Sequence, residues 1–229
     1  MTAAATFARQ VRCLVGKDVR RERRARATWP AALLLGFLLV LTLELQADLP
    51  VEMKQKLVGG LLWLAVFFAG ALGLERSFAD ENDAGCWDAL RMYPVSPAAV
   101  YIAKFVLNFT TLSGVAALLI PLLVVLADAP LLVHPAAMLF VAVLANLGLA
   151  AIGTLVGGLV NGVRRRANLV VLLLLPLILP VLLGAGEATR LLILDDLGKD
   201  FWRWIQLLAA FAVMFFTASV MVFEYVMED

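Results

Sequence analysis

Six long apolar runs constrain the fold of this chain more than any other feature of its sequence. Each run is long enough to cross a hydrocarbon layer of about 30 Å as a helix, and each lacks Lys, Arg, Asp and Glu except for Glu44 near the end of the first. Helices are the expected form, because strands at that depth must close into a barrel and alternate in polarity. The runs are approximately Trp29–Leu45, Leu57–Leu74, Phe105–Ala127, Pro135–Val160, Asn168–Ala185 and Trp204–Phe223.

The composition of the chain agrees with a membrane location. The 229 residues are 63% hydrophobic and 16% charged, whereas the apolar fraction of ordinary soluble domains is nearer half. We therefore predict an all-α integral membrane protein with six transmembrane helices, preceded by a basic segment over residues 1–28 and occupying residues 29–229. No cleavable signal peptide is expected, because the first apolar run follows a long basic segment and is long enough to span.

The Lys and Arg residues are distributed unequally between the two sides of this arrangement. Fourteen would lie on the side of the two termini and five on the other, so the positive-inside rule predicts that both termini are cytoplasmic. Residues 1–28 also place Phe7, Val11 and Leu14 at helical spacing. We expect an amphipathic helix along the cytoplasmic face, with its basic side toward anionic head groups. A plain basic tail would give the same topology and stays open.

A charged island from Leu74 to Lys104 interrupts the apolar chain on the expected cytoplasmic side. Within it, Asn82 or Asp83 can cap a short amphipathic helix, which would end before Pro94. One face of that helix carries Cys86, Leu90 and Tyr93 with the adjacent Trp87. Such a helix suits a groove in another protein. An interfacial helix resting on lipid is the alternative, but the acidic residues of the island suit an anionic surface poorly: Glu75, Asp80, Glu81, Asp83 and Asp88.

The chain lacks the sequence motifs of an ATPase or a metalloprotein. The dipeptides Gly16-Lys17 and Gly198-Lys199 are each followed by Asp rather than Ser or Thr, so a phosphate-binding loop is not expected. The single histidine, His134, cannot form a metal cluster. We expect it to be a solvated loop residue, and an axial haem ligand is the alternative. Cys13 and Cys86 would both lie in the cytoplasm, where reduced thiols are expected.

The apolar runs carry several residues that predict local structure. Pro135 suits a helix start, and Pro176 with Pro180 predicts a kink in the fifth run. Trp63 is expected near a membrane interface. Gly153 and Gly157 form a pair of small residues that favours close packing within one subunit over a dimer seam. The uncharged polar residues of the third and fourth runs should face neighbouring helices: Asn108, Thr110, Thr111, Ser113, Asn146 and Thr154.

The island resembles the first cytoplasmic loop of type-2 ABC transporter permeases. The resemblance rests on the order Gly85-x-x-Asp88-x-Leu90, then the Pro94-Val-Ser-Pro97 stretch, then Lys104. More narrowly, two stretches are similar to the CcmB family, the haem exporter permeases of cytochrome c maturation: Leu74-Glu75-Arg76-x-Phe78 and Leu175-Pro176-Leu177-x-x-Pro180. That family often has a hydroxyl residue after the loop glycine, where this chain has Cys86.

The resemblance implies a non-catalytic permease subunit, with 29–229 as the permease domain and 75–104 as its coupling loop. The implied partners are a cytoplasmic ATP-binding subunit, a second copy of the chain, a haem-handling membrane subunit, a small membrane subunit and a periplasmic haem chaperone. The implied location is the bacterial inner membrane, and no nucleic-acid partner is expected. The chain itself would bind no cofactor: ATP would be bound by the partner, and haem would be present in the complex.

The residues expected to contact the ATPase follow from the same resemblance. They are Glu75, Arg76, Asp83, Gly85, Cys86, Trp87, Asp88, Leu90, Tyr93 and Pro94. The function implied is coupling of ATP hydrolysis to haem export or to release of the haem-loaded chaperone. Two other functions stay open at this point: a type-2 exporter permease for lipid or polysaccharide, and a membrane scaffold protein without a transport cycle.

Overall fold

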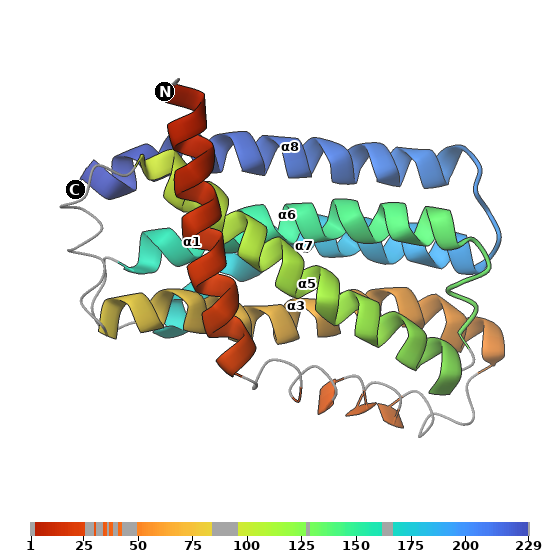
Figure 1. Ribbon diagram of the computed structural model, residues 1–229. Helices are drawn as coiled ribbons and strands as arrows, with labels where there is room; N and C mark the ends of the chain where they lie inside the picture. The colour runs from red at the N-terminus through yellow and green to blue at the C-terminus, as the bar shows by residue number, and fades with distance from the viewer. Residues whose placement is uncertain are drawn as a thin grey trace.

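The computed structural model confirms the all-α class within the residues that it describes, where it contains helices and turns but no strand. The described residues are 3–25, 30, 34–35, 37–38, 41–42, 50–83, 96–126, 129–161 and 167–228. The helices are α1 (Ala3–Ala25), α3 (Val51–Asp83), α5 (Pro97–Leu126), α6 (Pro135–Asn161), α7 (Ala167–Ile193) and α8 (Lys199–Glu228), as Figure 1 shows.

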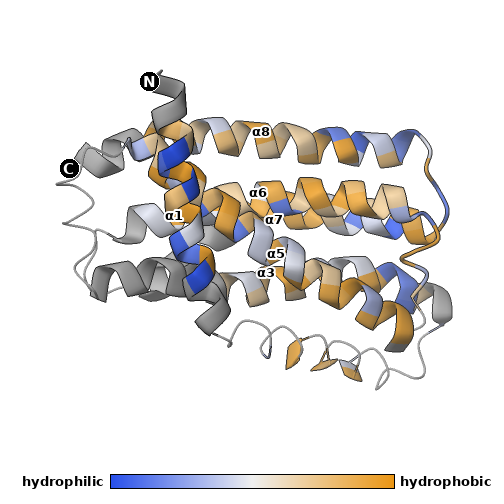
Figure 2. Cartoon of the chain, in the orientation of Figure 1, coloured by the Kyte–Doolittle hydropathy of each residue, from blue (hydrophilic) through white to orange (hydrophobic). Residues whose placement is uncertain are grey.

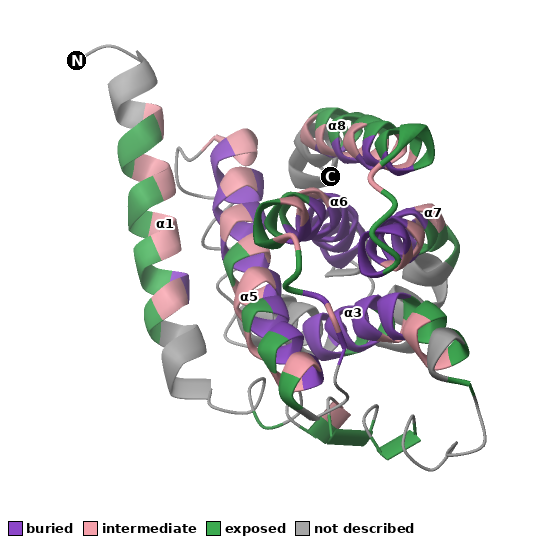
Figure 3. Cartoon of the chain, turned by 90° about the vertical axis from the view of Figure 1, so that its right-hand side faces the viewer, coloured by how far each residue is buried: buried purple, intermediate pink, exposed green. Residues whose placement is uncertain are grey.

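Five of these helices form a bundle around α6. Helix α6 packs against α3, α5, α7 and α8, and Figure 3 shows it in the middle of them with mostly buried residues. Helix α1 lies outside the bundle and crosses it instead of running along it (Figure 1). The connections between α5 and α6 and between α7 and α8 lie at one end, opposite the junction of α3 with α5. The bundle therefore has two distinct ends, as alternating membrane spans require.

Four helices are long and apolar enough to cross a membrane, among the residues that the structure describes. These stretches are Pro97–Val125, Pro135–Gly158, Pro176–Ile193 and Lys199–Val222, and they contain most of the third to sixth predicted runs. Figure 2 shows apolar residues along the bundle and hydrophilic residues near its ends and on α1. The second predicted run lies in α3, whereas most of the first lies outside the described residues. The count of six spans stays a prediction.

Two helix boundaries around the charged island differ from those expected. Helix α3 continues past Leu74 to Asp83, and α5 begins at Pro97 rather than at Phe105. The sequence after Leu74 contains no Gly or Pro before Gly85, so nothing in it ends the helix at the apolar boundary. The connection between the two helices is confined to residues 84–96 instead of the expected 75–104.

Helix α5 begins at Pro97 after the cap residue Ser96, and both precede the apolar run and so are not marked by hydropathy. The carbonyl oxygen of Ser96 accepts hydrogen bonds from the amides of Ala99 and Val100 at 2.9 and 3.3 Å. Pro97 follows in the first helical position, where its missing N–H costs little. Pro135 occupies the equivalent place in α6, since the carbonyl of His134 accepts from the amide of Met138. The expected helix start at Pro135 is thus confirmed.

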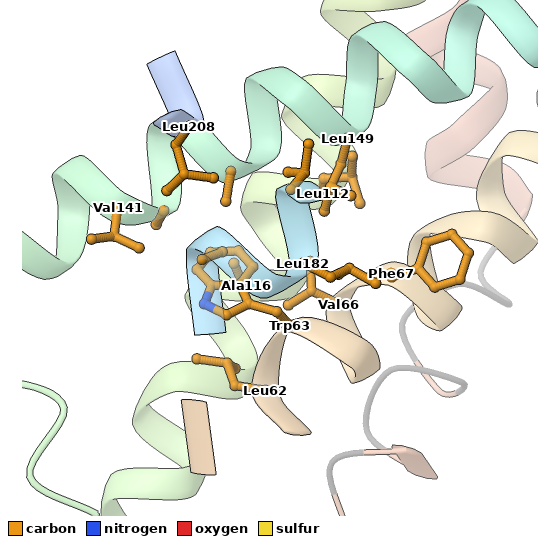
Figure 4. Packing of buried hydrophobic residues seen from close by; sticks show 14 of the residues in the cluster. Leu62, Trp63, Val66, Phe67, Leu112, Ala116, Val141, Leu149, Leu182 and Leu208 are labelled. Atoms are coloured by element: carbon orange, nitrogen blue, oxygen red, sulfur yellow. The ribbon is translucent and has the colours of Figure 1, made fainter. Parts of the chain in front are cut away.

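The core of the bundle is built on the buried face of α3. Leu62, Trp63, Val66 and Phe67 belong to a buried cluster to which the other four bundle helices also contribute (Figure 4). The other labelled members are Leu112 and Ala116 of α5, Val141 and Leu149 of α6, Leu182 of α7 and Leu208 of α8. Trp63 is fully buried within the bundle, and its expected place near a membrane interface stays a prediction. A hydrogen-bond partner in α7 satisfies its indole N–H and permits this burial.

Close contact between α3 and α7 depends on glycines. A Cβ atom added at Gly59 would lie 2.7 Å from the carbonyl oxygen of Gly186, closer than real Cβ atoms approach backbone oxygen. One added at Gly186 would lie 3.3 Å from the Cα atom of Gly60. The predicted small pair in α6, Gly153 and Gly157, is also buried within the chain, as packing inside one subunit requires. Helix α7 continues through Pro176 and Pro180.

Candidate functional site

The expected ATPase contact begins on the last turns of α3. Glu75, Arg76 and Asp83 are residues of that helix. The structure describes their backbone but not their side chains. Asn82 and Asp83, expected to cap a following helix, instead form the end of α3. The remaining expected contact residues also lie outside the described residues: Gly85, Cys86, Trp87, Asp88, Leu90, Tyr93 and Pro94. Their amphipathic helix stays a prediction.

Helix α1 presents a basic surface away from the bundle. Arg9, Arg12 and Arg20 are exposed, whereas Leu14 packs toward the hydrophobic core. Figure 3 shows the less exposed side of α1 turned toward α5. The apolar side of this helix is therefore covered at least partly by protein. The basic side is free to meet anionic groups.

A buried ion pair connects α1 with α5. The ammonium nitrogen of Lys104 lies 3.3 Å from Oδ2 of Asp18, and the two side chains are only 4% and 5% exposed. The partly exposed Lys17 lies 3.4 Å from the other carboxylate oxygen. Charged groups tolerate burial only when they are paired. Asp18 thus holds two ammonium groups from different elements close together.

This ion pair was not predicted from the sequence. In the sequence, Lys104 ends the charged island and the motif similar to type-2 permeases, and Asp18 belongs to no motif. The signal that could have found it is an acid on an apolar stripe: Asp18 follows Val11, Leu14 and Val15 at helical spacing. An acidic side chain on the buried side of a basic helix requires a cationic partner.

Aromatic side chains surround the same part of α5. Tyr101 and Phe105 lie one turn apart on α5, with ring centroids 6.2 Å from each other. Both rings meet Phe216 of α8, at 6.0 Å from Tyr101 and 5.0 Å from Phe105. The first turns of α5 are therefore fixed to α8 by ring packing and to α1 by charge. A force applied at Pro97 would reach both helices.

Uncharged polar groups connect α5 with α6 and α6 with α8 deeper in the bundle. The amide of Asn108 donates to the hydroxyl of Thr154 at 2.8 Å, and the amide of Asn146 donates to Ser113 at 3.4 Å. The hydroxyl of Ser219 in α8 donates to the carbonyl of Ala151 at 3.4 Å. Asn108, Ser113, Asn146 and Thr154 thus face neighbouring helices as predicted. The prediction was wrong for Thr110, which is exposed and donates to the carbonyl of Leu107 in its own helix.

At the opposite end of the bundle, His134 pairs with Asp195. Its Nε2 lies 2.6 Å from Oδ1 of Asp195, and the side chains are 37% and 74% exposed. His134 is thus a partly exposed residue beside the start of α6, in agreement with the preferred interpretation of it. Within the described part of the chain, no group of three or more His, Cys, Asp or Glu residues could hold a metal ion.

Comparisons with known proteins show a family match along nearly the whole chain and two relatives that cover about three quarters of it. The family model described as CcmB protein matches residues 9–227. Heme exporter protein B of Rhodobacter capsulatus is 32% identical over 183 residues, which cover 79% of this chain and 82% of that protein. Heme exporter protein B of Pseudomonas aeruginosa is 33% identical over 172 residues, covering 72% of this chain and 76% of that protein. The family match includes both the helical bundle and the segment joining α3 to α5.

Proposed function

The chain belongs to the CcmB protein family, and on this premise we propose that it is the permease component of an ABC complex for cytochrome c maturation. It is a multi-pass membrane protein with helices of the required length and apolarity. In our proposal it couples ATP hydrolysis by a partner protein to haem export or to release of a haem-loaded chaperone. The observation that carries the proposal is the family match over residues 9–227, which includes the proposed coupling segment.

The partner ATPase would bind the segment between α3 and α5. A short helix with Trp87 and Leu90 on one face suits a groove on a soluble protein. The packing of the flanking helices supports this role. Helix α3 is held in the core through Trp63 and its neighbours, and α5 is held by Lys104 and the aromatic side chains. Movement of the segment would therefore displace helices that contact most of the bundle.

We propose that this chain mainly transmits conformational change. The sequence contains one histidine, so a single copy cannot supply two histidine ligands to a haem iron. His134 lies in a connection at the end of the bundle opposite to the proposed ATPase contact (Figure 1). Haem held in the complex would then be bound mainly by the haem-handling membrane protein and the chaperone. Export of haem along a surface of this chain is the alternative.

The proposed orientation places both termini and the segment between α3 and α5 in the bacterial cytoplasm. Most Lys and Arg residues lie on that side. The connection holding His134 and the turn after α7 would then face the periplasm, where the haem chaperone acts. A second copy of the chain would complete the permease, with one ATP-binding protein for each copy.

The central test uses two substitutions in the proposed ATPase contact. Leu90→Asp and Trp87→Ala should leave the protein in the membrane but reduce ATPase co-purification and c-type cytochrome levels. Leu132→Asp is the matched control, because Leu132 is an exposed leucine in the connection at the opposite end. Normal co-purification and normal cytochrome levels in both variants would contradict the coupling role. Loss of envelope polymers with intact cytochromes after gene deletion would instead identify an exporter of lipid or polysaccharide.

A further inference from the structure

Helix α1 has a protein neighbour in the structure, which its amphipathic sequence alone does not require. A basic amphipathic helix can bind an anionic membrane surface without any protein partner. Here it packs against α5 and crosses the outside of the bundle (Figures 1 and 3). A specific contact is needed to hold it in one position on α5. The contact that most restricts how α1 can lie on α5 is the ion pair between Asp18 and Lys104.

The burial of this ion pair favours one position of α1 on α5. Lys104 and Asp18 are both almost inaccessible, so each charge would be poorly accommodated without the other. An apolar contact would let α1 slide or rotate on α5, whereas a paired charge fixes one register. If α1 left the surface of α5, both side chains would lose this contact. Docking of α1 therefore brings the carboxylate of Asp18 to the ammonium group of Lys104.

The position of Lys104 connects this event to the proposed ATPase contact. Lys104 lies about two turns into α5 from Pro97, where the chain leaves the segment expected to bind the ATPase. We propose that Asp18 is a positioning residue: its ion pair with Lys104 docks α1 on α5, so that α1 moves with the end of α5 that follows the coupling segment. The docking rests on the structure alone, and the coupled movement rests on the proposed function.

The docking is tested by a distance measurement on the purified full-length chain in lipid nanodiscs. With Cys86→Ser as background, spin labels are attached to the native exposed Cys13 of α1 and to Thr110→Cys, an exposed position of α5. Electron paramagnetic resonance should give one narrow distance peak for this protein. Asp18→Asn and Lys104→Met should each lose that narrow peak, because α1 is released from α5.

Two variants separate pairing from general damage. The exchanged protein carrying Asp18→Lys and Lys104→Asp should regain the narrow peak. Lys17→Ala should keep it, since Lys17 contacts Asp18 from a half-exposed position. A narrow peak in both Asp18→Asn and Lys104→Met would overturn the docking role. A broad distribution in the exchanged protein would overturn the pairing.

Coupled movement is tested by adding the partner ATPase with and without ATP. The distance from Cys13 to Thr110→Cys should stay constant. The distance from Cys13 to Leu183→Cys, an exposed position of α7, should shift with ATP and lose that shift in Asp18→Asn. A shift that persists unchanged in Asp18→Asn would overturn the coupled movement. Failure of the ATPase to bind both this background and the protein with its native Cys86 would count against the proposed function and leave the docking result standing.

Discussion

Trp63 of α3 donates its indole N–H to the hydroxyl oxygen of Thr189 in α7 across 2.9 Å, and neither side chain reaches the surface. The same hydroxyl donates to the carbonyl of Ala185 one turn earlier. The polar N–H of a tryptophan is accommodated in the core because both of these groups are satisfied. The contact joins two helices that are far apart in the sequence.

Removing the hydroxyl from this contact should destabilise the bundle. Thr189→Val keeps the shape of the side chain but leaves the indole N–H of Trp63 buried without a partner, at a cost of about 1–3 kcal/mol. Thermal unfolding in detergent, followed by circular dichroism, measures the effect. Thr189→Ser should retain most of the stability. An unchanged melting temperature in Thr189→Val would show that the hydrogen bond is dispensable.

The glycines between α3 and α7 provide a matched pair of substitutions. Gly59→Ala should destabilise by about 1–3 kcal/mol, because its methyl group would meet the carbonyl oxygen of Gly186 and force the helices apart. Gly60→Ala meets nothing within 4 Å and should be neutral or stabilising by about 1 kcal/mol through helix propensity. Denaturation of both variants in the same detergent tests the contrast, and equal effects would contradict the close packing.

Two buried asparagines should differ in their contribution to stability. Asn108→Leu removes a hydrogen bond of 2.8 Å and should cost about 0.6–1.5 kcal/mol. Asn146→Leu removes only a long bond to Ser113 and a carbonyl oxygen that has no partner among the described residues. The second substitution should be neutral or stabilising. Thermal unfolding of the two variants shows which substitution lowers stability more. A larger loss of stability in Asn146→Leu than in Asn108→Leu would contradict this prediction.

The backbone at Asp195 gives a prediction for the end of α7. Its φ angle is 57°, and the amides of Asp195 and Asp196 donate to the carbonyls of Leu192 and Leu191. This is a Schellman motif with aspartate in the place that glycine usually takes. Asp195→Ala should destabilise by about 1 kcal/mol or more, through left-handed strain and loss of the contact with His134.

Asp195→Gly separates these two causes. It relieves the strain but still lacks the carboxylate, so its stability should lie above that of Asp195→Ala. Thermal unfolding of both variants beside His134→Ala provides the comparison. If the Ala and Gly variants at position 195 unfold at the same temperature, the backbone strain contributes nothing.

The proposed orientation can be tested with the native Cys13. In the Cys86→Ser background, a membrane-impermeant maleimide should label Cys13 in inside-out vesicles but not in intact spheroplasts. A cysteine at position 132 in the connection before α6 should show the opposite pattern, with Cys13→Ser removing the background signal. Labelling of Cys13 in intact spheroplasts would place the N terminus in the periplasm and contradict the positive-inside assignment.

Part of the fold could be predicted because it depends on local composition. The third to sixth apolar runs became parts of α5, α6, α7 and α8, since uncharged helical stretches of that length are suited to the hydrocarbon layer. The ends of α3 and α5 were predicted less well. Hydropathy marks the edge of the membrane, whereas capping and breaking residues such as Pro97 mark the end of a helix.

The candidate site likewise has a part that the sequence predicts and a part that depends on the tertiary structure. The charged segment between α3 and α5 was found from its sequence, and residues 85–94 stay a prediction. The pair formed by Asp18 and Lys104 could not be found by examining either residue alone, because it depends on how α1 lies across α5. Reading Asp18 as an acid on an apolar stripe would have predicted burial but not its partner.

By itself, the sequence determined which parts of the chain are helical and apolar, and which family the chain resembles. Those properties depend on neighbouring residues, whose spacing on a helix is fixed by the backbone. Only the tertiary structure decided that Trp63 meets Thr189, that Gly59 meets Gly186 and that Asp18 meets Lys104. Each contact requires a particular rotation and register between two helices, and these are set jointly by the packing of the whole bundle.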